Sequence, residues 1–178
     1  MDARRLGPSG HVDSFTRERL PPPEAWPTLL LDRPEFQYPE HLNAAVELTD
    51  RMVERGFGAR VALIGEGRSR SYRELAEWTN RLAGALVEDY GVIPGQRVLL
   101  RSGNNPAFVA AWLAVTKAGA VAVNTMPMLR AAELTKIVDK AGISLALCDK
   151  RLVDDLAACA RDSAFLKRVV LFDGGDGH

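Results

Sequence analysis

The sequence has 178 residues, of which 47% are hydrophobic and 26% are charged, the profile of a water-soluble globular protein of one domain or slightly more. Its 23 basic residues balance its 23 acidic ones, which argues against nucleic acid or an anionic membrane as the main partner. The two cysteines form no CxxC motif, no apolar run approaches the roughly 18 residues of a membrane helix, and no secretory signal opens the chain, so a cytoplasmic location is the simplest interpretation.

Residues 1–39 form a proline-rich segment that contains seven of the ten prolines. Because proline lacks an N–H donor and restricts the residue before it, a long helix does not fit here. We expect an extended N-terminal arm, mobile over residues 1–12 and held to the rest of the chain by Trp26 and the leucines at 29–31.

After residue 39 the pattern becomes regular. Apolar residues recur at helical spacing from His41 to Arg55, and glycines end that predicted helix. Residues 61–64 (VALI) are predicted to form a short buried strand. The following segment, 65–67 (GEG), lacks the third glycine of a dinucleotide-binding motif and does not lead into a helix. It is therefore predicted to be a hairpin or tight turn.

Capping residues mark two helix starts. Ser71 and Glu74 have the spacing of a capping box, which opens a helix that ends near Gly91. Asn105 followed by Pro106 begins a second helix. This second helix is apolar on nearly every side, so we expect it to be buried on more than one face and to end at the glycine at 119.

The later segments continue the alternation of strand and helix. Strands are predicted at 97–100, 120–123, 145–148 and 169–172, and helices at 107–118, 130–140 and 152–161. This order predicts an α/β fold with a doubly wound, mostly parallel sheet and helices on both faces. We assign residues 40–178 to this α/β subdomain. The glycine-rich stretch at 174–177 is typical of a loop between domains, so we expect a piece of a larger protein.

Residue types that usually carry catalysis are sparse. The histidines His11, His41 and His178 lie in the arm, at a helix start and at the last position, and are interpreted as solvated or capping residues. Cys148 and Cys159 are interpreted as buried packing residues. Because no nucleophile, base and orienting group come together, we predict neither a catalytic residue nor a metal ligand in this chain.

Three cations follow strands at the edge where open α/β sheets bind ligands. Arg130 opens a helix after the strand at 120–123, and Lys150 and Arg151 open another after the strand at 145–148. Free N–H groups at a helix start favour anions, and arginine can hold phosphate through two N–H groups. The alternative is that all three are ordinary solvated surface charges.

Several segments resemble the adenylate-forming acyl-CoA synthetase family. Residues 71–75 (SYREL), 94–100 (PGQRVLL) and 112–120 (WLAVTKAGA) are similar to three motifs near the start of that family. Four further segments resemble the aryl branch of the family, which includes the 2-aminobenzoate-CoA and benzoate-CoA ligases. They are 20–24 (LPPPE), 38–40 (YPE), 97–105 (RVLLRSGNN) and 125–130 (TMPMLR).

The resemblance implies a ligase that works in two half-reactions. A carboxylate attacks the α-phosphate of Mg²⁺-ATP to give an acyl-adenylate and pyrophosphate, and the thiol of coenzyme A then displaces AMP to give a thioester. The implied partners are a small aromatic carboxylic acid, ATP, Mg²⁺ and coenzyme A. The family's phosphate-binding loop, its acidic motif for ribose and metal, and its C-terminal lysine match no segment here. We therefore expect the N-terminal portion of such a ligase, inactive alone and binding none of these cofactors tightly.

The resemblance also implies a role for the three cations. Some aryl-CoA ligases place an arginine on the path of the coenzyme A phosphates, at the position that Met128 occupies here. Arg130, two residues later, is the substitute candidate. Acetate-activating relatives carry arginines near the positions of Lys150 and Arg151. The implied role of Arg130, Lys150 and Arg151 is therefore coenzyme A binding.

Other interpretations stay open. The chain fits a non-catalytic α/β module that binds a partner chain or a nucleotide, and it also fits part of another adenylate-forming enzyme, such as a peptide-synthetase adenylation domain. The coding sequence after residue 178 would distinguish the ligase from the non-catalytic module, because a glycine-rich phosphate-binding loop there would indicate a ligase. Since a fragment leaves apolar surface uncovered, we expect the isolated chain to form a homo-oligomer.

Overall fold

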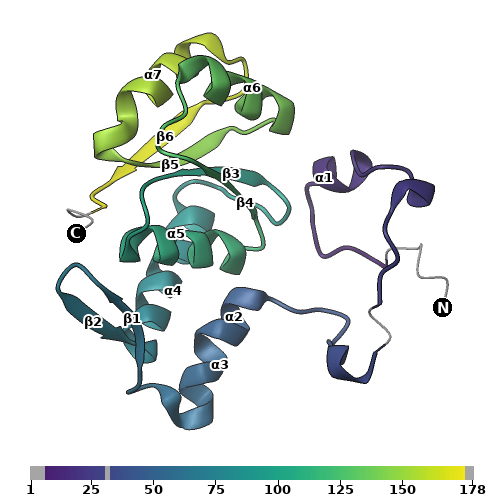
Figure 1. Ribbon diagram of the computed structural model, residues 1–178, viewed down its shortest axis with the longest axis vertical. Helices are drawn as coiled ribbons and strands as arrows, with labels where there is room; N and C mark the ends of the chain where they lie inside the picture. The colour runs from purple at the N-terminus through teal and green to yellow at the C-terminus, as the bar shows by residue number, and fades with distance from the viewer. Residues whose placement is uncertain (1–6, 31–32, 175–178) are drawn as a thin grey trace.

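The computed structural model describes residues 7–30 and 33–174, and its centre is a four-stranded parallel sheet with helices on both faces (Figure 1). The strands are β3 (Arg97–Arg101), β4 (Val121–Thr125), β5 (Leu145–Asp149) and β6 (Arg168–Phe172), in the order β4-β3-β5-β6. Helices α4 (Tyr72–Glu88) and α5 (Pro106–Lys117) cover one face, and α6 (Ala131–Ala141) and α7 (Val153–Asp162) cover the other. The predicted doubly wound α/β fold is confirmed.

The two central strands form the middle of the core. All five residues of β3 and all five of β5 are buried, which fits the apolar runs at 98–100 and 145–148. Val98 and Leu100 pack toward α4 and α5, whereas Leu99 packs toward α6 and α7. This alternation follows from the two-residue period of a strand, and it lets one strand stabilise both helical layers.

Residues 61–71 form a separate hairpin outside the parallel sheet. Strand β1 (Val61–Gly65) pairs antiparallel with β2 (Arg68–Ser71), and Glu66 and Gly67 turn the chain with positive φ angles of 56° and 69°. The predicted hairpin is therefore confirmed. The predicted burial of 61–64 is wrong: β1 pairs only with β2, and Ile64 is 84% exposed.

The helix predicted over 41–55 is broken at Thr49. It is replaced by α2 (Ala44–Leu48), α3 (Asp50–Met52) and a π-helical turn, η3 (Val53–Phe57). Thr49 adopts φ −124° and ψ −75°, and its hydroxyl donates to the carbonyl oxygen of Ala45 at 2.6 Å. A side chain that bonds its own helix in this way competes with the regular backbone pattern.

Lys117, at the end of α5, holds that break in place. Its ammonium group donates to the hydroxyl of Thr49 at 3.0 Å, to the side-chain oxygen of Asn80 at 2.8 Å, and to the carboxylate of Asp50. The Lys117 side chain is 10% exposed and Thr49 is fully buried. We call these four residues the Lys117 cluster; it joins α3, α4 and α5 through charge-assisted hydrogen bonds.

The predicted helix caps are confirmed. Ser71 and Glu74 form the capping box of α4, and the Asn105 side chain accepts from the N–H of Phe108 at 2.8 Å at the start of α5. Gly119 follows α5 with φ 74°, the left-handed conformation that suits glycine at a helix end. As expected, α5 packs both against the sheet and against α2 and α4.

The N-terminal arm contains short turns and docks on the amino end of the sheet (Figure 1). It holds α1 (Phe15–Glu18), η1 (Pro23–Ala25) and η2 (Pro34–Phe36), and no long helix is present in its described residues. The N–H groups of Val12 and Asp13 donate to the carbonyl of Pro94, and the Asp13 carboxylate pairs with Arg97. The Arg97 guanidinium also lies 4.1 Å from the centre of the Phe15 ring, close enough for a cation–π contact.

The arm is therefore anchored at a different place from the one predicted. The indole N–H of Trp26 donates to Pro21 within the arm, not to the α/β body. Residues 1–6 and 31–32, which include parts of the predicted mobile stretch and of the predicted leucine anchor, lie outside the described residues. The boundary between residues 39 and 40 stays a prediction. No helix in the described residues is long and apolar enough to cross a bilayer.

Candidate functional site

The sheet reverses its strand order between β3 and β5. The chain leaves β3 for α5 on one face and leaves β5 for α7 on the other, so the two loops diverge at the carboxyl ends of the strands (Figure 1). Open α/β sheets bind their ligands in the crevice that forms at such a point. The candidate site is therefore this carboxyl edge, opposite the edge where the arm docks.

Polar side chains are buried at the reversal point. Ser102 and Asn105 follow β3, and Asp149 ends β5 and is 1% exposed. The Asn105 amide donates to the Ser102 hydroxyl at 2.9 Å. Arg151 holds Asp149 with two charge-assisted bonds, Nε to Oδ1 at 3.0 Å and a terminal nitrogen to Oδ2 at 2.6 Å. Buried polar groups that are paired in this way keep the loops in one arrangement.

The chain after β6 passes directly over this group. A Cβ atom added to Gly174 would lie 2.1 Å from a carboxylate oxygen of Asp149 and 2.7 Å from the amide nitrogen of Asn105. Only a residue without a side chain permits this approach. The carboxyl ends of β3, β5 and β6 are thus brought together by residues 105, 149 and 174.

The pKa of Asp149 is lowered, chiefly by its hydrogen bond from Arg151, and burial opposes this shift. Because the folded-state pKa is below the unfolded value, this carboxylate stabilises the fold above its ordinary pKa of 3.8. That stabilisation is lost as the pH falls through the folded pKa.

We expect the thermal stability of the chain to fall as the pH drops below about 4, and Asp149→Asn to weaken that acid sensitivity while lowering stability at neutral pH. The measurement is a series of thermal melts monitored by circular dichroism. Asp154→Asn, at an exposed position on α7, is the control. An Asp149→Asn variant with the unchanged pH slope of the parent chain would contradict the assignment.

The three predicted cations all lie at the carboxyl edge, but the structure does not join them in one cluster. Arg130, which is 80% exposed, pairs with Asp155 at 3.2 Å. Lys150 pairs with Asp173 beyond β6, and Arg151 pairs with Asp149. Each cation is thus held by a different carboxylate, and an anionic ligand would compete with these partners.

Arg101 is, with Ser102 and Asp149, a residue of this edge that sequence reasoning missed. It ends β3, its side chain is 1% exposed, and its guanidinium donates to carbonyl oxygens of the β4–α6 loop and of Leu152. One feature of the sequence could have identified it: an arginine at the end of an apolar strand. A charged side chain at such a position is rarely buried unless it has hydrogen-bond partners.

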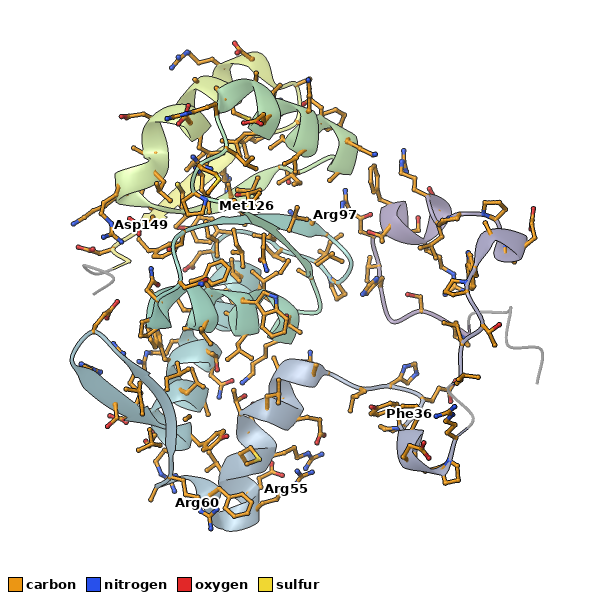
Figure 2. All side chains as sticks on the ribbon, in the orientation of Figure 1. Phe36, Arg55, Arg60, Arg97, Met126 and Asp149 are labelled. Carbon is orange, nitrogen blue, oxygen red and sulfur yellow. The ribbon has the colours of Figure 1, made fainter. Side chains whose placement is uncertain are left out.

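A groove of about 440 Å³ opens beside Arg101. Residues from the end of β3, the start of α5 and the end of β4 line it: Ser102, Gly103, Asn104, Phe108, Asn124, Thr125, Met126 and Pro127. Its lining combines amide, hydroxyl and apolar side chains, which suits a ligand with both apolar and polar parts. Figure 2 shows Met126 and Asp149 at this edge and Arg97 near the arm.

The cysteines and histidines do not form part of the candidate site. Cys148 and Cys159 are both unpaired and fully buried, as predicted, and burial raises the pKa of Cys148 to about 11. No group of three or more His, Cys, Asp or Glu residues able to hold a metal ion occurs in the described part of the chain. Two of the histidines, His11 and His41, are exposed, and His178 lies outside the described residues.

Comparison with known proteins finds a match to the family model described as "AMP-binding enzyme" over residues 51–177. A 3-hydroxybenzoate--CoA/4-hydroxybenzoate--CoA ligase from Thauera aromatica is 34% identical over 115 residues, which are 65% of this chain and 22% of that protein. A salicyl-AMP ligase / salicyl-S-ArCP synthetase from Mycobacterium tuberculosis is 35% identical over 140 residues, 76% of this chain and 24% of that protein.

Among solved structures, the fold is similar to that of the anthranilate CoA ligase AuaEII, with a TM-score of 0.70 and 21% identity over 76% of this chain and 26% of that one. The chain thus spans less than a quarter of the length of these two curated relatives, 22% and 24%.

Proposed function

Because this chain belongs to the AMP-binding enzyme family, we propose that it is the N-terminal part of an ATP-dependent ligase that converts an aromatic carboxylic acid into an acyl-adenylate and then into a coenzyme A thioester. The observation that carries the proposal is the family match over residues 51–177, together with a hydroxybenzoate-CoA ligase 34% identical over 115 residues. The reaction needs activation because a carboxylate oxygen leaves poorly, whereas AMP leaves readily.

The proposed contribution of this chain is scaffold and part of the coenzyme A path. Coenzyme A carries phosphates, and Arg130, Lys150 and Arg151 offer positive charge at the carboxyl edge, with side chains 80%, 56% and 44% exposed. Arg130 is the most available of the three. ATP and Mg²⁺ are assigned to residues outside this chain, and the chain alone is expected to perform neither half-reaction.

The proposed acid is a 2-aminobenzoate- or benzoate-like molecule. The segments at 97–105 and 125–130 support it, and so does the hydroxybenzoate named for the relative from Thauera aromatica.

We further propose that residues 1–39 act as an arm on an α/β subdomain of residues 40–178. The exposed apolar side chains of β1, Val61 at 54% and Ile64 at 84%, support the predicted self-association of the isolated chain.

The decisive experiment compares this chain with the complete protein encoded by its reading frame. With ATP, Mg²⁺, coenzyme A and a panel of benzoates, the complete protein should release AMP and form an aryl-CoA, detected by mass spectrometry. The 178-residue chain should release neither pyrophosphate nor AMP. Turnover by the chain alone would overturn the fragment proposal, and a complete protein without acid-dependent AMP release would favour a non-catalytic module.

Arg130→Ala tests the coenzyme A assignment in the complete protein. We expect the KM for coenzyme A to rise about tenfold, because a charge-assisted contact to phosphate contributes on the order of 1.5 kcal/mol or more. Acid-dependent exchange of pyrophosphate into ATP should be unchanged, since it reports the first half-reaction only. Arg161→Ala, at an exposed position at the far end of α7, is the matched control. An unchanged KM for coenzyme A would discard the assignment.

A second candidate differs in the acceptor of the acyl group. The relative from Mycobacterium tuberculosis is named a salicyl-S-ArCP synthetase, and its match covers more of this chain than that of the hydroxybenzoate ligase. The acceptor of the complete protein would then be a thiol on a carrier protein. Offering coenzyme A and an aryl carrier protein in parallel distinguishes the two, because only the true acceptor accelerates AMP release.

A further inference from the structure

The shape of the loop between β4 and α6 is imposed from inside the protein by Arg101. The guanidinium donates to the carbonyl oxygens of Met126 at 3.1 Å, Pro127 at 2.9 Å and Leu129 at 2.8 Å. Its Nε donates to the carbonyl of Leu152 at 3.2 Å, so the same side chain also holds the start of α7. A planar guanidinium with five diverging N–H groups can bind several carbonyls at once, which a lysine ammonium on a single atom cannot match.

Asp155 extends this network to the surface. One carboxylate oxygen lies 3.8 Å from the Arg101 guanidinium and accepts from Arg130 at 3.2 Å. The other oxygen accepts from the backbone N–H of Ala131 at 3.2 Å, in the first turn of α6. The exposed Arg130 is thus connected through one carboxylate to a fully buried arginine.

The network decides which way the loop presents its side chains. Because the carbonyls of residues 126, 127 and 129 point inward to Arg101, the Met126 and Met128 side chains are left outward, 58% and 72% exposed. Met126 and Pro127 line the groove at the carboxyl edge. Loss of the guanidinium would remove this donor from the carbonyls of Pro127 and Leu129 and leave the carbonyl of Met126 with only the Leu129 N–H at 3.2 Å, so the loop would rearrange to satisfy them.

We infer that Arg101 is a positioning residue for the thiol-transfer half-reaction: it fixes the 126–130 loop and, through Asp155, the direction in which Arg130 meets the incoming acceptor. The inference rests on the proposed function. Arg101 itself contacts no substrate, since it is buried beneath the loop that it holds. Its effect is therefore expected on acceptor binding and not on adenylation.

The first test measures the loop directly and needs no catalysis. Hydrogen–deuterium exchange of the 178-residue chain should show faster exchange of the 126–131 amides in Arg101→Lys than in the parent. Arg97→Lys is the matched control, because Arg97 is also buried and starts the same strand at the opposite edge. If Arg101→Lys does not fold, Arg101→Gln, which also removes the guanidinium that binds the three loop carbonyls, replaces it. Equal protection of 126–131 in the parent and in the folded variant would overturn the inference.

The second test uses the complete protein. Arg101→Lys and Asp155→Asn should raise the KM for the acceptor thiol about tenfold while acid-dependent pyrophosphate exchange stays within about twofold of the parent. Arg97→Lys should change neither. If both half-reactions decline together, Arg101 has only a structural role and the inference fails. If the complete protein forms no adenylate, the proposed function fails, while the exchange experiment still decides whether Arg101 holds the loop.

Discussion

Replacing Lys117 with methionine is expected to lower the free energy of unfolding by about 2–3 kcal/mol. The methionine keeps the apolar stem but leaves Thr49, Asp50 and Asn80 without the ammonium group that each of them contacts. The cost stays below the roughly 3–5 kcal/mol of a fully buried broken pair, because Asp50 is 30% exposed and regains some water. Urea unfolding followed by tryptophan fluorescence measures the change.

The control for this prediction is Lys136→Met, on the exposed surface of α6. It removes the same charge from the same residue type without touching a buried cluster, and should change stability by less than about 0.5 kcal/mol. Asp50→Asn in the Lys117→Met background adds a second check, since removing the stranded carboxylate should recover part of the loss. Equal effects of the two lysine variants would show that the Lys117 cluster contributes nothing to stability.

Gly95→Ala is expected to destabilise the chain by about 2–4 kcal/mol and to release the N-terminal arm. Gly95 has φ +88°, and an added Cβ would lie 2.4 Å from the carbonyl oxygen of Asp13 and 2.8 Å from the Cβ of His11. The left-handed backbone accounts for about 1–2 kcal/mol of this cost, and the remainder comes from lost contacts between the arm and Pro94. Limited proteolysis should then cut the arm faster, and thermal melting should occur at a lower temperature.

Two further variants make this prediction specific. Gly84→Ala, within α4 and with open space around its Cβ, should be neutral or stabilising, since alanine favours helix by about 1 kcal/mol over glycine. Asp13→Ala removes the ion pair with Arg97 and leaves the Gly95 turn intact, so it should release the arm without straining that turn. An arm that stays protease-resistant in Gly95→Ala would refute the docking seen here.

The candidate site could be predicted only in part. Arg130, Lys150 and Arg151 were placed correctly at the carboxyl edge, because strands of a parallel sheet all end on the same side. The sequence could not identify the carboxylate that pairs with Arg130 or with Lys150, because Asp155 and Asp173 are distant along the chain. Only the pair of Arg151 with Asp149, two residues away, could have been inferred. Arg101 was not identified as a site residue, since its partners are carbonyl groups, which every residue carries.

The sequence by itself determined the features that depend on neighbours along the chain: the alternation of strand and helix, the Ser71–Glu74 capping box, the cap at Asn105 and the turn at 65–67. Local hydrogen bonds and side-chain periodicity are sufficient for these. Only the tertiary structure decided the break at Thr49, the exposed position of β1, the docking of the arm at Arg97 and the inward turn of the 126–130 loop. Each of these depends on a buried charge or an edge whose partner is distant in the sequence, and no local pattern of residues identifies that partner.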